Sequence, residues 1–79
     1  MNVIINIKDS NLGLEDGAII RVKDLNGEFV IEANSSGLTS LAKHMLILAS
    51  EKFESGDHVH YDEGMLLEEG SVNFVIEKI

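Results

Sequence analysis

The chain has 79 residues with no cysteine and no proline, and its fourteen acidic residues outnumber six basic ones to give a net charge of −8. This length suits one domain (residues 1–79) with a small core, and the lack of cysteine excludes disulfides and thiolate metal sites. The acidic balance disfavours nucleic acids and anionic membranes as partners, because both bind Lys and Arg. Because the apolar run near the N-terminus is too short for a signal peptide or a membrane span, we expect a cytoplasmic protein.

Alternation of apolar and polar residues predicts three strands in the first half of the chain. The first contains Val3, Ile5 and Ile7. The next two flank Asn26-Gly27, a dipeptide typical of a two-residue type I′ hairpin, in which both turn residues need a positive φ. Such a turn pairs Leu25 with Glu28, and continuing the register away from the turn pairs the apolar residues of the two strands with each other.

A helix is predicted after the hairpin. Asn34-Ser35-Ser36 offers side-chain oxygens that can cap the first free helix amides, and Gly56 is a suitable left-handed cap for the helix end. Apolar residues recur at helical spacing and predict an inward stripe: Leu38, Leu41, Ala42, Met45, Leu48, Ala49 and Phe53. A rotation of 100° per residue places Ile47 in the middle of the opposite, polar face and His44 at the edge of the stripe.

Two further strands complete the predicted fold. One is His58-Val59-His60-Tyr61-Asp62, and the other contains Val72, Phe74 and Ile76. The order β-β-β-α-β-β predicts an α+β fold with a single five-stranded, mainly antiparallel sheet and one helix packed on one face. The residues expected to face the helix are Val3, Ile5, Ile7, Ile20, Val22, Phe29, Ile31, Val59, Tyr61, Val72, Phe74 and Ile76.

One helix covers one face of such a sheet, so the other face is expected to be open. Its apolar residues would be Ile4, Ile19, Val30 and Val75, beside the polar residues Asn6, Arg21, Glu32, His58, His60 and Asn73. Four β-branched residues are more than a monomer usually exposes together. The pattern therefore predicts that a partner or a second copy of the chain covers this face, and Ile47 offers another contact for a homo-oligomer.

His58, His60 and Asp62 form the densest cluster of ligand-capable side chains, because alternation places all three on one face of a strand. Two histidines in this arrangement are common in zinc sites, with Asp62 or His44 as a third ligand. Solvated histidines that hydrogen-bond across strands are a second interpretation. Recognition of a partner is the third and the one we favour, so that we expect no metal and no cofactor.

Enzyme chemistry has little support in the sequence. It has no cysteine nucleophile, no Ser-x-x-Lys motif and no Gly-rich phosphate loop. His58 with Asp62 or Glu63 would make an acid–base pair, but a fold with one helix offers little enclosed space for a substrate. We therefore expect that the protein is not an enzyme.

Three segments of the C-terminal half carry a family resemblance. They read G-L-x-S-L-A-x-H from Gly37, H-x-H-x-D from His58 and L-E-E-G-S from Leu67. In this order, and with the closing Val75-Ile76-Glu77-Lys78-Ile79, they resemble the immunity protein 32 family over residues 34–79. The resemblance implies a small bacterial protein of a polymorphic toxin system that binds and neutralises a cognate toxin without catalysis.

The positions that match the family pattern are the implied functional surface. They are His44, His58, His60, Asp62, Glu68 and Glu69, to which the open sheet face adds Ile4, Val30 and Val75 as partner-binding candidates. The net charge of −8 suits capping of a basic active site, such as that of a nuclease. The alternative is a small-ligand or metal-binding module, such as a phage-type nucleotide sponge that acts as a homo-oligomer.

Overall fold

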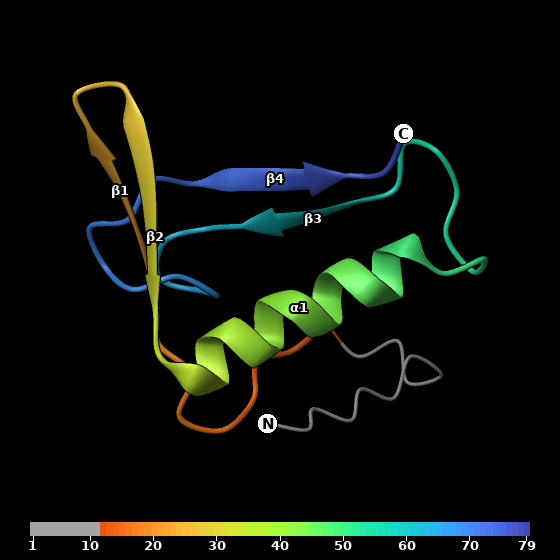
Figure 1. Cartoon of the computed structure of the whole chain (residues 1–79), viewed down its shortest axis with the longest axis horizontal. Coiled ribbons are helices and arrows are strands. Elements are labelled where there is room, and N and C mark those ends of the chain that lie inside the picture. The colour runs from red at the N-terminus through yellow and green to blue at the C-terminus, as the bar shows by residue number, and fades with distance from the viewer. Residues whose placement is uncertain (1–11) are drawn as a thin grey trace.

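In the computed structural model of the chain, residues 12–79 are described, so the strand predicted at Val3, Ile5 and Ile7 and the candidate Ile4 lie outside the described residues. The elements are two strands, β1 (Ile20–Leu25) and β2 (Glu28–Ala33), a helix, α1 (Ser35–Ala49), and two further strands, β3 (His58–Tyr61) and β4 (Phe74–Glu77). Strands β3 and β4 run along α1, whereas the β1–β2 hairpin stands across its N-terminal end (Figure 1).

The hairpin has the predicted register. Leu25 pairs with Glu28 and, at the other end of the hairpin, Ile20 pairs with Ala33. Asn26 and Gly27 have φ angles of 57° and 87°, as a type I′ turn requires. The turn sequence therefore sets which residues of β1 and β2 share a face.

The prediction of a single five-stranded sheet is wrong, although the fold is α+β. Within residues 12–79 the strands form two separate antiparallel pairs, β1–β2 and β3–β4. An irregular segment occupies the second edge of β1, where the N–H groups of Glu68 and Val72 donate to the carbonyls of Ile20 and Val22 at 2.8 and 3.0 Å. Ser71 Oγ accepts a further bond from the N–H of Val22 at 3.2 Å. Because this segment satisfies the edge, no strand continues the sheet there.

Asn34, one of the three predicted cap candidates, caps the start of α1. Its Oδ1 accepts hydrogen bonds from the N–H groups of Gly37 at 2.8 Å and Ile19 at 3.0 Å. Its Nδ2 donates to the carbonyl of Gly17 at 2.8 Å. One side chain therefore caps the helix and ties it to the loop that precedes β1.

The helix ends at Ala49, before the predicted cap at Gly56. Ser50 ends it, because both its N–H and its hydroxyl bond the carbonyl of Ile47, at 3.1 and 2.7 Å. Lys78 Nζ then donates to the carbonyls of Ser50 and Phe53 at 2.9 and 2.8 Å. The end of the chain thus anchors the C-terminal end of α1.

The buried face of α1 is rotated away from the predicted stripe. Ile47, expected on the polar face, is completely buried, so its side chain is not available for a contact between copies. Apolar side chains that α1 exposes instead include Leu38, Met45 and Leu46. Ser40 and His44 lie on the inward face. Ser40 Oγ accepts from the N–H of Glu15 and donates to the carbonyl of Ser36, both at 2.8 Å, which permits its burial.

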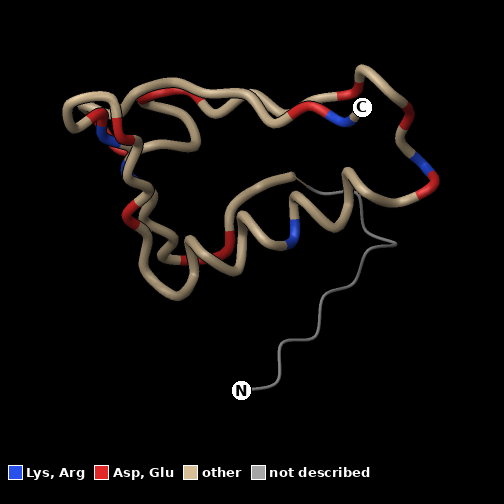
Figure 2. Tube along the Cα trace, turned by 45° about the horizontal axis from the view of Figure 1, so that its top comes forward, with Lys and Arg blue, Asp and Glu red and all other residues tan. Residues whose placement is uncertain are grey.

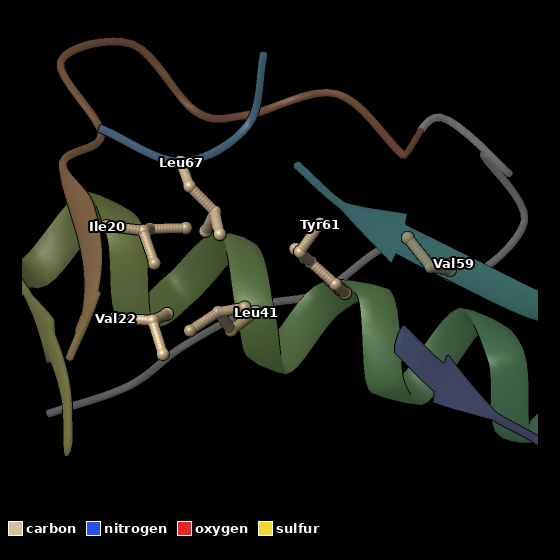
Figure 3. Packing of buried hydrophobic residues seen from close by; sticks show 6 residues of the cluster. All are labelled: Ile20, Val22, Leu41, Val59, Tyr61 and Leu67. Carbon is tan, nitrogen blue, oxygen red and sulfur yellow. The ribbon is translucent and has the colours of Figure 1, made fainter. Parts of the chain in front are cut away.

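The core forms where both strand pairs meet α1 (Figure 3). Its buried members are Ile20, Val22, Leu41, Val59, Tyr61 and Leu67. The expected burial of Phe29 and Ile31 is wrong, since these side chains are 65% and 48% exposed. The hairpin projects beyond α1, which leaves this part of β2 uncovered (Figure 1). No helix within residues 12–79 has the length and apolar character needed to cross a membrane.

A substitution at Gly37 tests how closely α1 packs on the hairpin. A Cβ at this position would collide with the carbonyl oxygen of Ile19 and press on Ile20 and Ala33. We expect Gly37→Ala to lower the free energy of unfolding by about 1–3 kcal/mol, measured by urea denaturation, despite the higher helix propensity of Ala. Ser35→Ala, at an exposed position of the same turn, is the control, and equal stability of the two variants would contradict the close packing.

Candidate functional site

Strands β3 and β4 have one face on α1 and one face in solvent. Their register pairs His58 with Glu77 and His60 with Val75. All four of these side chains are exposed, whereas Val59 and Tyr61, the residues between and after the histidines, are buried. The alternation seen in the sequence therefore produces a two-faced sheet. We call the exposed side chains of His58, His60, Val75 and Glu77 the outer face of β3–β4.

The two imidazoles of the outer face contact each other edge to face. Their ring centroids are 4.8 Å apart and the ring planes meet at 84°. His58 Nδ1 lies 2.8 Å from the carbonyl oxygen of Gly56, and because a carbonyl only accepts, Nδ1 carries the proton. This bond orients the ring and leaves His58 Nε2 as the nitrogen available to a partner.

The structure does not gather all predicted site residues on this face. Asp62, directly after β3, is partly buried, and its backbone carbonyl accepts the N–H groups of Met65 and Leu67 at 3.2 and 3.1 Å. Glu68 and Glu69 belong to the segment that lies along β1, and Val30 belongs to β2. Of the nine candidates, His58, His60 and Val75 therefore share the outer face of β3–β4.

The ligand-type side chains of this face, His58, His60 and Glu77, are not grouped as a metal site requires. Within the described part of the chain, no three His, Cys, Asp or Glu side chains are grouped closely enough to hold a metal ion. Protein zinc sites use three or four protein ligands. The arrangement of His58 and His60 instead offers two exposed rings that can donate or accept hydrogen bonds.

His44 lies in the core, with 1% of its surface exposed. Its Nε2 is 3.0 Å from the carbonyl oxygen of Gly13, so Nε2 carries a proton, and its Nδ1 is 2.8 Å from Tyr61 Oη. In the neutral ring Nδ1 accepts the bond that the Tyr61 hydroxyl donates. Tyr61 in turn stacks on Phe74 of β4, with centroids 4.5 Å apart and planes 5° from parallel. His44 therefore joins α1 to the inner face of β3–β4.

Phe29 and Ile31 are surface residues that the sequence analysis missed. With Val22, Val72, Asn73 and Phe74 they line a hollow of about 220 Å³ between the hairpin and the segment that enters β4. The sequence feature that indicates their exposure is their closeness to the Asn26-Gly27 turn. The tip of a hairpin extends past the area that a single helix covers (Figure 1).

Acidic residues occur from the hairpin to the loop after α1 and the end of β4 (Figure 2), and most of those described are exposed. Glu32 pairs with Lys23 at 3.0 Å and with Arg21 at 3.7 Å across the hairpin. The hydrogen bond and charge of Lys23 hold the pKa of Glu32 below its usual value. Lys43 pairs more loosely with Glu15 at 4.0 Å. These pairs occupy basic side chains that are already scarce, so the surface keeps a large acidic excess.

The buried phenol gives a test of the core. Burial raises the pKa of Tyr61 to about 12 from an ordinary value of about 10, because the phenolate loses hydration. Tyr61 is the one tyrosine of the sequence, so ultraviolet absorbance of phenolate reports it alone. We expect its titration midpoint near pH 12 in the folded chain.

The same shift predicts how stability depends on pH. Between about pH 10 and pH 12 the unfolded chain loses the tyrosine proton while the folded chain keeps it, so stability falls by up to about 1.4 kcal/mol per pH unit. Tyr61→Phe removes this component and is the control for other titrating groups. A midpoint near pH 10 in the folded chain would contradict the burial of the Tyr61 hydroxyl.

Comparison with known protein families identifies the family of the chain. Residues 28–79 match the family model described as Immunity protein 32, from the first residue of β2 through α1 and β3 to the end of the chain. No curated protein and no solved structure matches the chain. The matched segment includes the outer face of β3–β4 and all three motifs on which the sequence resemblance rests, and it spans well over half of the chain. The chain belongs to the immunity protein 32 family.

Proposed function

We propose that the chain is a small, non-catalytic immunity protein that binds and neutralises a cognate toxin. Membership of the immunity protein 32 family carries this proposal. The net charge of −8 supports a basic toxin, such as a nuclease, because opposite charge speeds the encounter of two proteins and favours the correct partner.

The openness of the outer face of β3–β4 supports inhibition by binding. His58 and His60 are exposed on an open strand face, where water is not excluded. The hollow beside Phe29 and Ile31 is lined by apolar residues and one Asn, and it contains no titratable side chain. Neither place combines a pocket with an acid–base pair.

We propose the outer face of β3–β4 as a toxin-binding surface. Val75, 48% exposed, supplies apolar area beside two imidazoles and the carboxylate of Glu77. Interfaces combine such apolar contact with hydrogen-bonding groups. The face is backed by the buried Tyr61 and its contact with His44, so a toxin meets a preformed surface and little ordering opposes binding.

The other sequence candidates have different places in this proposal. Asp62 is partly buried and directly follows the last residue of β3, and His44 supports the outer face from inside the core. Val30, Glu68 and Glu69 lie with the β1–β2 hairpin and are outside the outer face of β3–β4.

The test uses a candidate toxin, chosen from the polypeptides encoded in the gene neighbourhood of this chain. We expect the wild type to co-purify with it, and the His58→Ala/His60→Ala variant to bind at least about tenfold more weakly, because two central hydrogen-bonding rings are lost. Isothermal titration calorimetry measures both affinities. Leu38→Ala/Met45→Ala truncates two exposed side chains of α1 and is the matched control, with affinity expected to stay at the wild-type value.

Two results would contradict the proposal at different levels. Wild-type affinity in the histidine variant would show that the toxin binds elsewhere on the chain. Failure of the folded wild type to bind the neighbouring toxin would contradict the function itself.

A further inference from the structure

The two edges of the β1–β2 hairpin differ. The outer edge of β1 is covered, since the carbonyls of Ile20 and Val22 accept hydrogen bonds from Glu68 and Val72. In an antiparallel pair, alternate residues direct their backbone groups to the partner strand and to the outer edge. Ile20 and Val22 are two of the outward-directed residues of β1, and this alternation also determines the pattern of β2.

Among residues 12–79, nothing covers the outer edge of β2. A two-residue turn at Asn26-Gly27 makes Leu25 and Glu28 a hydrogen-bonded pair, so Phe29 and Ile31 direct their N–H and C=O groups away from β1. Within residues 12–79, β2 pairs with β1 alone, and no other segment hydrogen-bonds to this edge. Proteins usually protect such an edge with charges, proline or a bulge. Here the outward-directed residues Phe29, Ile31 and Ala33 are all apolar.

The side chains of this edge border a binding hollow. Phe29 and Ile31 are 65% and 48% exposed, and they lie on the same side of the hairpin as the hollow of about 220 Å³. A large exposed aromatic side chain beside an apolar hollow is typical of a protein-binding site. If a strand were added to β2, its alternate side chains would point toward this hollow.

The other face of β2 carries acidic and apolar side chains. Glu28, Val30 and Glu32 alternate there, and Glu32 is already paired with Lys23 and Arg21. Glu28 is exposed and makes no ion pair with any residue of the described range. A basic side chain of an added strand would therefore find an unpaired carboxylate.

A second copy of the chain fits this edge less well than a basic partner does. Each copy carries a net charge of −8, so two copies repel each other. In an antiparallel β2–β2 contact centred on Val30, Glu28 would also lie opposite Glu32, and facing like charges destabilise strand pairing.

We propose that an extended segment of the cognate toxin pairs with the outer edge of β2 and adds a third strand to the β1–β2 sheet. Its apolar side chains enter the hollow beside Phe29 and Ile31, and Lys or Arg at alternate positions faces Glu28. Backbone hydrogen bonds supply affinity in such strand addition, and the side-chain hollow supplies specificity. The inference rests on the proposed function because it takes the toxin as the source of the strand.

A peptide tests the chemistry of the edge without the toxin. The probe is acetyl-(Lys-Val)₃-amide, titrated into the ¹⁵N-labelled full-length chain and followed by NMR. We expect the largest shift changes at the amides of Phe29 and Ile31. Methylation of the peptide nitrogens that face β2, or replacement of Lys by Glu, is expected to weaken binding at least tenfold. No binding, equal binding of the methylated peptide, or shifts confined to other regions would overturn the proposal.

A chain variant tests the same edge in the toxin complex. Ile31→Pro removes an N–H that makes no bond to β1, so the hairpin keeps its ladder while the edge loses a donor. We expect at least a tenfold loss of toxin affinity, and slower hydrogen exchange at Phe29 and Ile31 in the wild-type complex. Leu25→Ser removes an exposed apolar side chain of β1 outside the hollow and is the control, expected to bind as the wild type does.

The outcomes separate the two proposals. If the wild type binds toxin and Ile31→Pro binds equally well, the edge proposal fails and the immunity function stands. If the wild type binds no toxin, the function fails, and the result with the peptide decides whether the edge accepts a basic strand. Concentration-dependent dimerisation in sedimentation, with protected Phe29 and Ile31 amides, would assign the edge to a second copy and overturn the proposal.

Discussion

The buried hydrogen bond between His44 of α1 and Tyr61 of β3 ties the helix to the C-terminal strand pair. A two-stranded sheet is marginally stable alone, and this structure has two of them in its described residues. His44 also bonds the Gly13 carbonyl, while Tyr61 stacks on Phe74, so one buried contact reaches the loop before β1, the helix and both C-terminal strands. Loss of either partner would leave a buried polar atom unpaired, at a cost of about 1–3 kcal/mol.

The contact between His44 and Tyr61 also determines which surfaces are exposed to solvent. Because the inner face of β3–β4 is held on α1, His58, His60 and Val75 face solvent on a preformed strand pair. Because α1 and its loops are engaged there, the far part of the hairpin is left uncovered, and Phe29 and Ile31 stay exposed at an open strand edge. The two surfaces belong to different sheets, so a toxin that contacts both would hold the chain more firmly than either small surface alone permits.

The features that sequence predicts well are local ones. Asn26-Gly27 determines the hairpin register, Asn34 caps α1, and alternation in the His58–Asp62 stretch separates exposed from buried side chains. The family motifs also lie in continuous segments, and the family match bears them out. The errors concern contacts between distant residues. Coverage of β1 by Glu68 and Val72 ends the sheet without a strand, and no periodicity in the sequence signals it.

The helix face and His44 were misjudged for a related reason. Hydrophobic periodicity places polar residues outside, but Ser40 and His44 are buried because their hydrogen-bond partners lie elsewhere in the chain, at Glu15, Gly13 and Tyr61. Their burial rotates α1 and brings Ile47 inside. His44 and Ile47 are therefore buried and do not lie on the surface. The exposed surface at Phe29 and Ile31 was not predicted from the sequence.

The central claim is that this chain neutralises a toxin by occupying it. The most direct measurement is a titration of the purified toxin's activity with increasing amounts of the folded chain, at toxin concentrations well above the Kd. Inhibition by binding predicts a linear fall that reaches zero at one equivalent of chain, with intact toxin recovered from the complex after denaturation. Complete inactivation by a small fraction of an equivalent, modification of the recovered toxin, or undiminished activity in excess chain would contradict the account.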